Sequence, residues 1–166
     1  MFKITMVLRI LYIILFIILN YSNLQGQQLK FIKEADLEEI LKNQDNKLHV
    51  ISLWASWCPP CVREMPVFQN TSFLYNTTEV RFIMISLDYP DKMETQLIPF
   101  LKKYDINLEV LLMMDTDYLK WADKVDPDFQ GNIPSTLFIN NAKKIRHFHA
   151  GEITATELRS IIDKLK

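Results

Sequence analysis

Two cysteines, Cys58 and Cys61, stand three positions apart in the stretch Trp-Cys-Pro-Pro-Cys, and the chain has no others. The stretch lies between a short apolar run, residues 48–54, and a helical pattern that runs from Cys61 to about residue 74. Two thiols at the start of a helix can close a disulfide with little backbone movement, and the free N–H groups there favour a thiolate on the first sulfur. Cys58 can therefore attack a substrate disulfide, and Cys61 can resolve the mixed disulfide that forms.

Two cysteines could instead form a structural disulfide or half of a zinc site. A zinc site needs two more ligands, and His49, His147 and His149 do not have the spacing of a zinc finger. His147 and His149 lie two residues apart and share one strand face, where an ordinary polar sheet surface is favoured over a metal pair. We therefore predict redox chemistry at Cys58 and Cys61 and no metal site.

The hydrophobic pattern around these cysteines alternates short strands with helices. We predict helices over residues 34–42, 61–74 and 91–104, and strands over residues 48–54, 80–87 and 110–113. A hairpin is predicted over residues 134–148, with its turn at Asn140-Asn141, a pair that tolerates positive φ. A capping box of Thr154 and Glu157 begins a last helix. This order indicates an α/β fold with a mixed central sheet flanked by helices, in one domain over residues 29–166.

Composition and charge exclude several classes of protein. The chain has 166 residues, of which 49% are hydrophobic and only 3 are glycine, which excludes a disordered chain and a collagen-like repeat. With 19 basic and 20 acidic residues, the formal net charge is -1, so no basic field points to nucleic acid. Two cysteines cannot form the disulfide framework of a small secreted protein, so we expect an ordinary hydrophobic core.

The first 26 residues differ from the rest of the chain. They contain Lys3 and Arg9 and no acid, and residues 10–19 are an unbroken apolar run that polar residues follow. A basic start, a short apolar run and a polar exit are typical of a secretory signal peptide, with a retained N-terminal anchor as the alternative. We predict that the chain is exported to the periplasm or cell envelope of a bacterium, and that it is anchored in the inner membrane if the N-terminal segment is retained. Disulfides can persist in these places.

Several separated motifs carry a resemblance to the thioredoxin superfamily that covers residues 29–166. Residues 54–61, Trp-Ala-Ser-Trp-Cys-Pro-Pro-Cys, look like the active-site stretch of that family. Pro66 matches the proline that kinks the active-site helix, and Gly151 matches a glycine before the last helix. Ile133-Pro134 looks like the loop that holds a cis-proline opposite the dithiol. The resemblance implies a thioredoxin-like fold and a substrate-binding edge formed by Trp57, Pro59, Pro60, Ile133 and Pro134.

Within the superfamily, the chain is similar to the exported thiol-disulfide oxidoreductases of the TlpA/ResA type. Those proteins have an extra helix and strand after the second sheet strand, which suits residues 91–113 here. The resemblance implies protein or peptide disulfides as substrates, a membrane-borne electron donor, a monomer that needs no cofactor, and cytochrome c maturation as one process that such an activity serves. Contact with a membrane is expected only through the N-terminal segment.

Glu64, three residues after Cys61, matches an acidic residue of the members that serve cytochrome c maturation. One helical turn separates the two side chains, so the carboxylate could exchange protons with the resolving thiol. A solvated Glu in the first helical turn is the alternative. Thioredoxin has a buried Asp six residues before its first active-site cysteine, where this chain has Ser52, so water or Glu64 must accept the Cys61 proton.

Pro60 bears on the direction of electron flow. The strong oxidants of this fold have a His before the second cysteine, whose charge and backbone N–H stabilise the thiolate. Pro60 supplies neither. A less stabilised thiolate lowers the reduction potential, so we predict a reductase or isomerase rather than a primary oxidant.

Two other functions remain open on sequence alone. A peroxidase of the peroxiredoxin kind needs a lone activated cysteine in a Pro-rich, Thr-containing pocket, and the stretch around Cys58 departs from that pattern. A copper carrier of the thioredoxin-like kind has two cysteines separated by three residues and a partner His. Cys58 and Cys61 are one residue too close for that, so Cu(I) would have to be held by two thiols alone.

Overall fold

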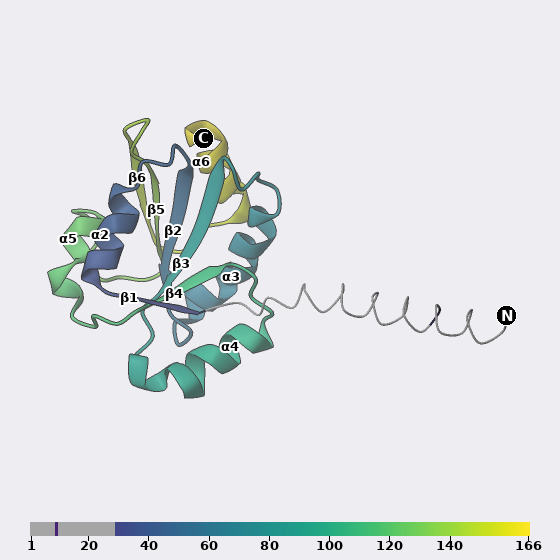
Figure 1. The fold of residues 1–166 in the computed structure, drawn as a ribbon, viewed down its shortest axis with the longest axis vertical. Helices are drawn as coiled ribbons and strands as arrows, with labels where there is room; N and C mark the ends of the chain where they lie inside the picture. Colours follow the sequence, from purple (N-terminus) through teal and green to yellow (C-terminus); the bar gives the residue numbers. More distant parts are fainter. Residues whose placement is uncertain (1–8, 10–28) are drawn as a thin grey trace.

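The computed structural model describes Arg9 and residues 29–166. In this part of the chain six strands form one sheet in the order β1-β4-β3-β2-β5-β6 (Figure 1). Their bounds are β1 Lys30–Ile32, β2 Leu48–Trp54, β3 Val80–Ser86, β4 Glu109–Met113, β5 Ser135–Asn140 and β6 Ile145–Ala150. Strands β1, β4, β3 and β2 run parallel, and β5 and β6 are antiparallel additions at one edge. The predicted mixed sheet is confirmed.

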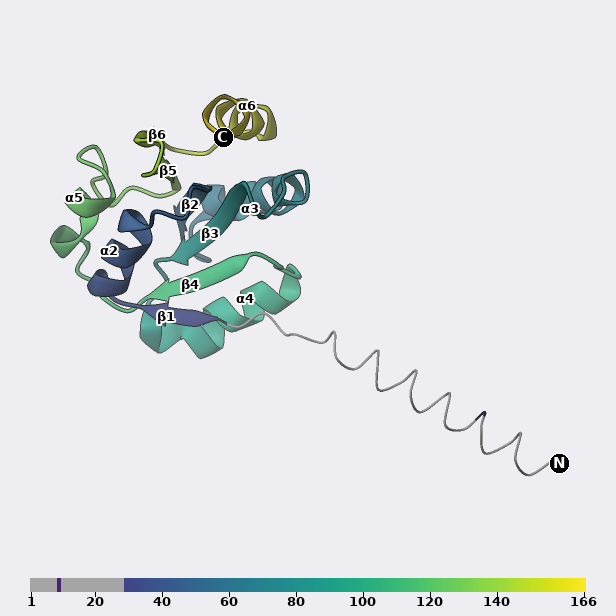
Figure 2. The ribbon, with the colours of Figure 1, turned by 45° about the horizontal axis from the view of Figure 1, so that its top comes forward.

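Helices cover both faces of the sheet. Their bounds are α2 Glu34–Lys42, α3 Pro59–Ser72, α4 Ile98–Lys103, α5 Ala122–Val125 and α6 Ala155–Leu165. Figure 2 shows α2 and α5 on one side of the sheet, and α3, α4 and α6 on the other. All seven residues of β2 are buried, as expected of a parallel strand with helices above and below it. The loop that carries Cys58 therefore follows directly after a fully buried central strand.

Each face of the sheet has its own hydrophobic core. On the side of α3 and α6, Trp54 is fully buried, and the centroid of its ring lies 5.4 Å from that of Phe100. On the other side, Trp121 packs against Phe129 with ring centroids 6.0 Å apart. The last helix begins at the predicted capping box, in which the Thr154 hydroxyl accepts from the Glu157 N–H.

The insertion between β3 and β4 is confirmed, but its helix is less regular than predicted. Residues 91–104 begin as a 3₁₀ turn at Pro90–Lys92, continue as a π-helical turn at Met93–Leu97 and become α-helical only in α4. Pro99 has no N–H to donate to the carbonyl four residues earlier, so a regular helix through this point would lack a bond. The chain instead bonds the Ile98 N–H to the Met93 carbonyl, five residues back.

Two smaller expectations are corrected. Helix α3 begins at Pro59 rather than Cys61, because a proline in the first turn loses no hydrogen bond. In the hairpin, positive φ occurs at Lys144 (56°) and not at Asn140-Asn141. The Asn141 side chain instead donates to the carbonyls of Leu41 and Asn43, which ties the hairpin to the end of α2.

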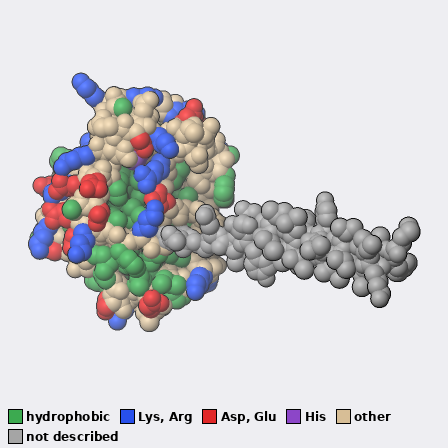
Figure 3. All heavy atoms as spheres, in the orientation of Figure 1, with side chains coloured by type: hydrophobic (Ala, Val, Ile, Leu, Met, Phe, Trp, Pro, Cys, Tyr) green, Lys and Arg blue, Asp and Glu red, His purple; other side chains and the backbone are tan. Residues whose placement is uncertain are grey.

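The interpretation of residues 1–26 as a signal peptide or anchor falls outside the part of the chain that the structure describes, apart from Arg9. Among the described residues, no helix is long and apolar enough to cross a membrane. Figure 3 shows Lys, Arg, Asp and Glu side chains mixed on the side where α2 and α5 lie. Lys124 there pairs with both Glu34 and Glu38.

Candidate active site

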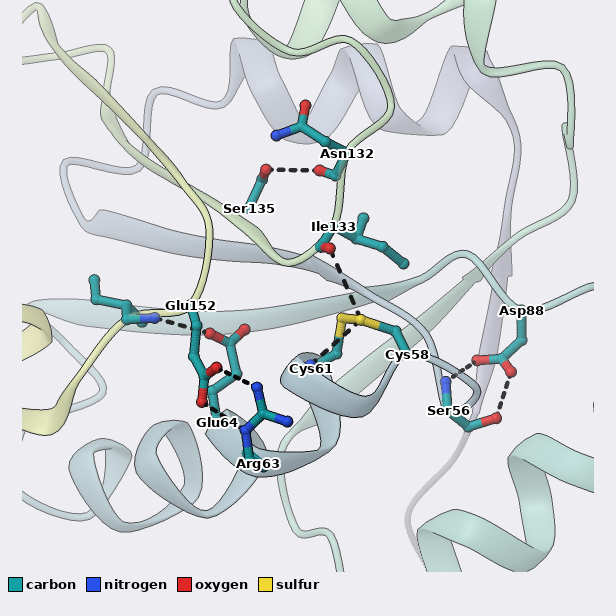
Figure 4. The surroundings of a disulfide bond; sticks show 11 residues. Ser56, Cys58, Cys61, Arg63, Glu64, Asp88, Asn132, Ile133, Ser135 and Glu152 are labelled. Atoms are coloured by element: carbon teal, nitrogen blue, oxygen red, sulfur yellow. Dashed lines mark hydrogen bonds and ion pairs between the residues drawn. A yellow bond between two sulfur atoms is a disulfide. The ribbon is translucent and has the colours of Figure 1, made fainter.

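The two cysteines form a disulfide where the loop after β2 enters α3 (Figure 4). Cys58 is the N-cap residue of α3, and its Sγ accepts the Cys61 N–H at 3.3 Å. Pro59 and Pro60 occupy the first helical turn, where the missing N–H groups cost nothing. Cys58 is 4% exposed and Cys61 is 0% exposed. Cys58 is thus the less completely buried of the two cysteines.

The loop before β5 lies against the disulfide. The Ile133–Pro134 peptide bond is cis, as the resemblance implied. The Ile133 carbonyl oxygen lies 3.8 Å from Cys58 Sγ, where it could accept a hydrogen bond from the thiol once the disulfide is reduced. Ser135 Oγ donates to the Asn132 carbonyl and fixes the turn that brings this loop to the cysteines. Figure 4 shows the loop facing the disulfide from the side opposite α3.

Glu64 is buried beside the dithiol end of α3, and only 2% of it is exposed. Its Oε2 accepts the Ile153 N–H at 3.1 Å, while Oε1 is buried without a hydrogen bond among the described residues. Burial raises the Glu64 pKa from 4.5 to about 8, and the charge of nearby Glu152 adds to this, against the lowering effect of the Ile153 N–H. The alternative of a solvated first-turn Glu is therefore wrong.

Asp88 holds the loop that carries Cys58, a role that no motif in the sequence predicted. Its carboxylate accepts the Ser56 N–H at 2.9 Å and the hydroxyls of Ser56 and Ser86. Ser56 follows β2 and Asp88 follows β3, and these neighbouring parallel strands end at the same edge of the sheet. That adjacency was the available signal, because polar residues just after neighbouring parallel strands come together.

The residues predicted to bind substrate surround the Cys58 side of the disulfide. Trp57 is 52% exposed and stacks on Tyr89, with ring centroids 6.5 Å apart. Pro59 is exposed and Pro60 is half-buried at the start of α3, while Pro134 is buried in the facing loop. Ser52, which stands where thioredoxin has Asp, is fully buried opposite Thr136 of β5.

The histidines lie away from this site. His147 and His149 are on the edge strand β6, and His49 Nε2 binds the Asp45 carboxylate at 2.9 Å. Within residues 29–166 no three His, Cys, Asp or Glu side chains are grouped so that they could hold a metal ion.

Two proteins named as thiol-disulfide oxidoreductases are similar to this chain. Sporulation thiol-disulfide oxidoreductase A of Bacillus subtilis is 24% identical over 131 residues, which cover 79% of this chain and 74% of that protein. Thiol-disulfide oxidoreductase ResA of Oceanobacillus iheyensis is 28% identical over 140 residues, 83% of this chain and 68% of that protein. These matches confirm the resemblance to ResA-type proteins that the sequence motifs indicated.

Solved structures agree on the fold. A thioredoxin-related protein from Neisseria meningitidis serogroup B superposes with a TM-score of 0.62 at 21% identity, covering 70% of this chain and 83% of its own. A secreted disulfide oxidoreductase of Mycobacterium tuberculosis superposes with a TM-score of 0.55 at 23% identity, covering 74% and 84%. The fold is thioredoxin-like. The Redoxin family model matches residues 20–165, far more than half of the chain, and the protein therefore belongs to the Redoxin family.

Proposed function

We propose that this protein is a thiol-disulfide oxidoreductase in which Cys58 attacks the substrate and Cys61 completes the exchange. The observation that carries the proposal is the Cys58–Cys61 disulfide at the start of α3, with Cys58 the more exposed sulfur. In the reduced protein, the Cys58 thiolate attacks a substrate disulfide and releases one substrate thiolate. Cys61 then attacks Cys58 Sγ, and the second substrate thiolate leaves. Two electrons pass to the substrate, and the protein is left as the disulfide that the structure contains.

Glu64 serves the proton transfers of this cycle. Cys61 must lose its proton before it attacks the mixed disulfide, and the nearest carboxylate along the helix is one turn away. Support comes from its burial and from its pKa of about 8, which lets it take up and release a proton near neutral pH. Ser52 cannot ionise in this range, so it does not take the place of the Asp of thioredoxin.

Substrate docks across the edge formed by Trp57, Pro59, Pro60, Ile133 and Pro134. These residues flank Cys58 from the active-site loop and from the facing cis-proline loop. A protein or peptide with an extended segment around its disulfide fits this edge, because backbone groups of the loop are at hand for hydrogen bonds. The substrates are therefore protein or peptide disulfides.

The protein is exported and acts there as a reductant or isomerase. Pro60 supports the direction, because it offers neither charge nor N–H to a Cys58 thiolate. The basic and apolar start of the chain supports export of residues 29–166, to the periplasm or cell envelope of a bacterium, with residues 1–26 as signal or anchor. A reductant in an oxidising compartment needs a supply of electrons, which a membrane-borne donor would provide. The protein works as a monomer. Apocytochromes in cytochrome c maturation are one class of substrate.

Two single variants test the roles of the cysteines. In a Cys61→Ser protein, Cys58 still attacks but nothing resolves the product, so a peptide disulfide should leave a stable mixed disulfide that mass spectrometry detects. Cys58→Ser has the matched change at the other sulfur and should form almost none. Faster trapping on Cys61 in the Cys58→Ser protein than on Cys58 in the Cys61→Ser protein would reverse the assignment. Turnover of hydrogen peroxide without any disulfide substrate, or copper retained stoichiometrically through gel filtration, would point to the peroxidase or the copper carrier instead.

A further inference from the structure

A pocket of about 160 Å³ is lined by two residues that adjoin Cys58, although neither cysteine lines it. Trp57, which precedes Cys58, forms one wall, and Ile133, whose carbonyl lies 3.8 Å from Cys58 Sγ, forms another. The segments that connect β3 to β4 and β4 to β5 supply most of the other walls, including Asp88, Tyr89, Asp115 and Tyr118. An extended peptide advances about 3.3–3.6 Å per residue. A side chain within three residues of a cysteine that reacts with Cys58 can therefore enter this pocket.

Aromatic rings form much of the wall. Tyr89 stacks on Trp57, and Trp121, which is 1% exposed, also lines the pocket. Tyr118 lies directly against the backbone of Gly131, where a Cβ would come within 2.8 Å of the ring. The glycine thus lets the ring lie flat beside the pocket.

Two aspartates line the same pocket, and no cation among the described residues lines it with them. Asp88 is bound only by neutral donors, which are the Ser56 N–H and the hydroxyls of Ser56 and Ser86. Asp115 accepts the Glu34 N–H through Oδ2, and its backbone carbonyl accepts the Trp121 indole N–H at 2.8 Å. No Lys, Arg or His lines the pocket, and neither carboxylate has an ion-pair partner among the described residues.

Aromatic faces and uncompensated carboxylates select for positive charge. The ring faces attract an ammonium or guanidinium group, and the apolar stem of Lys or Arg suits the ring surfaces. An anionic side chain would be repelled by both carboxylates, and a neutral apolar one would gain nothing from them. The hollow on the other side of Trp57 has the reverse character, since it contains Lys103 and no acid.

We propose that this pocket binds a Lys or Arg side chain of the protein substrate, within three residues of the cysteine that reacts with Cys58. The proposal rests on the proposed function and adds a substrate class to it, namely disulfides flanked by basic residues. The pocket acts by binding and orienting the substrate, because its carboxylates and rings contact the side chain and not the reacting sulfurs.

The test uses disulfide-linked dimers of a short peptide with one cysteine, so that both halves are identical. Lys, Arg, norleucine or Glu is placed one, two or three residues from the cysteine on either side. The rate constant for reduction by the pre-reduced protein is followed through Trp fluorescence. At one or more positions we expect Lys and Arg peptides to react about tenfold faster than the norleucine peptide, the size of one good cation–aromatic or ion-pair contact.

Variants locate the effect. In Asp115→Asn, whose amide can still accept the Glu34 N–H, and in Tyr89→Leu, the Lys-to-norleucine ratio should fall to about threefold or less. Asp91→Asn makes the same charge change three residues after Asp88, at a residue paired with Lys92 outside the pocket, and should keep the full ratio. Ratios within one variant are unaffected by any loss of folded protein.

Equal rates for all peptides at every position would overturn the pocket proposal while leaving the oxidoreductase intact. So would a Lys preference that survives unchanged in Asp115→Asn and Tyr89→Leu. If no peptide disulfide is reduced at all, the proposed function itself fails. The two failures are therefore distinguishable in one set of measurements.

Discussion

The two sulfurs of one disulfide face different surroundings. On the Cys61 side, the sulfur is fully buried and the nearest carboxylate along the helix is that of Glu64, which is buried too and has a raised pKa. On the Cys58 side lie the half-exposed rings of Trp57 and Tyr89 and a pocket with two unpaired carboxylates. Under the proposed function, this difference assigns proton transfer to the buried side and substrate recognition to the open side. Changes on one side should alter pH dependence, and changes on the other should alter substrate preference.

The largest expected effect on stability is at Glu64. Its pKa is about 8 in the folded, oxidised protein and about 4.5 when unfolded, so the folded state binds the proton more tightly. The free energy of unfolding therefore falls as the pH rises from about 4.5 to about 8, and it levels off above that. Glu64→Gln cannot ionise and avoids this loss. Urea unfolding should show the variant more stable above pH 8 by up to about 5 kcal/mol, and nearly equal below pH 4.5.

Glu39→Gln is the matched control for this prediction, because Glu39 is an exposed carboxylate on α2. It should not show a stability gain that grows with pH. If Glu64→Gln follows the wild-type curve at every pH, then Glu64 does not ionise against a penalty and its proposed part in proton transfer loses its basis. The Lys-to-norleucine ratio should stay at the wild-type value in Glu64→Gln, because the pocket lies on the other side.

The next largest effect is expected at Asp88, which supports the open side. Asp88→Ala leaves the Ser56 N–H and two hydroxyls without their acceptor, which should lower the free energy of unfolding by about 3 kcal/mol. The loop that carries Cys58 should also loosen, so that iodoacetamide alkylates reduced Cys58 faster. Asp91→Ala removes an exposed carboxylate nearby and should change neither quantity. Equal stability of Asp88→Ala and wild type would mean that the loop is held by other contacts.

Much of this site could be predicted from the sequence, because its residues are close along the chain or carry a motif. Cys58, Cys61 and Glu64 lie on one short helix start, and Pro134 belongs to a recognisable loop. The burial of Glu64 could not be predicted, since the segment that packs against it and donates the Ile153 N–H is 89 residues away along the chain.

The pocket and the irregular helix of the insertion could not be predicted from the sequence for a similar reason. Asp88, Asp115 and Tyr118 meet only because β3 and β4 are neighbours and the segment after β4 folds back over the active-site loop. Hydrophobic periodicity reports which face of an element is buried and carries no information on which loops come together. The π-helical turn before α4 is explained by the missing N–H of Pro99. The hydrophobic pattern does not distinguish this proline from an ordinary helical residue.

Pro60 lies between the two sides and should set the potential that they share. Pro60→His adds a charge and an N–H near Cys58, so the reduction potential should rise by about 30–60 mV, or roughly 1.4–3 kcal/mol. Pro60→Ala adds only the N–H and should give a smaller rise, which separates the two contributions. Equilibration with glutathione or dithiothreitol, read by Trp fluorescence, measures both. A starting value near -120 mV rather than near -270 mV, or no rise in Pro60→His, would contradict the reductant assignment.

The smallest effect distinguishes two glycines with positive φ. Gly131 and Gly151 have φ of 83° and 95°, so alanine at either should cost about 1 kcal/mol in backbone strain. Only at Gly131 would the new Cβ also meet a side chain, the Tyr118 ring at 2.8 Å, whereas at Gly151 nothing lies within 4 Å. Gly131→Ala should therefore displace Tyr118 and reduce the Lys-to-norleucine ratio, while Gly151→Ala, which adds backbone strain alone, should lose less thermal stability and keep the ratio. A loss of the ratio in both variants would show that the preference does not depend on the position of Tyr118, and the division between the two sides of the disulfide would then have to be abandoned.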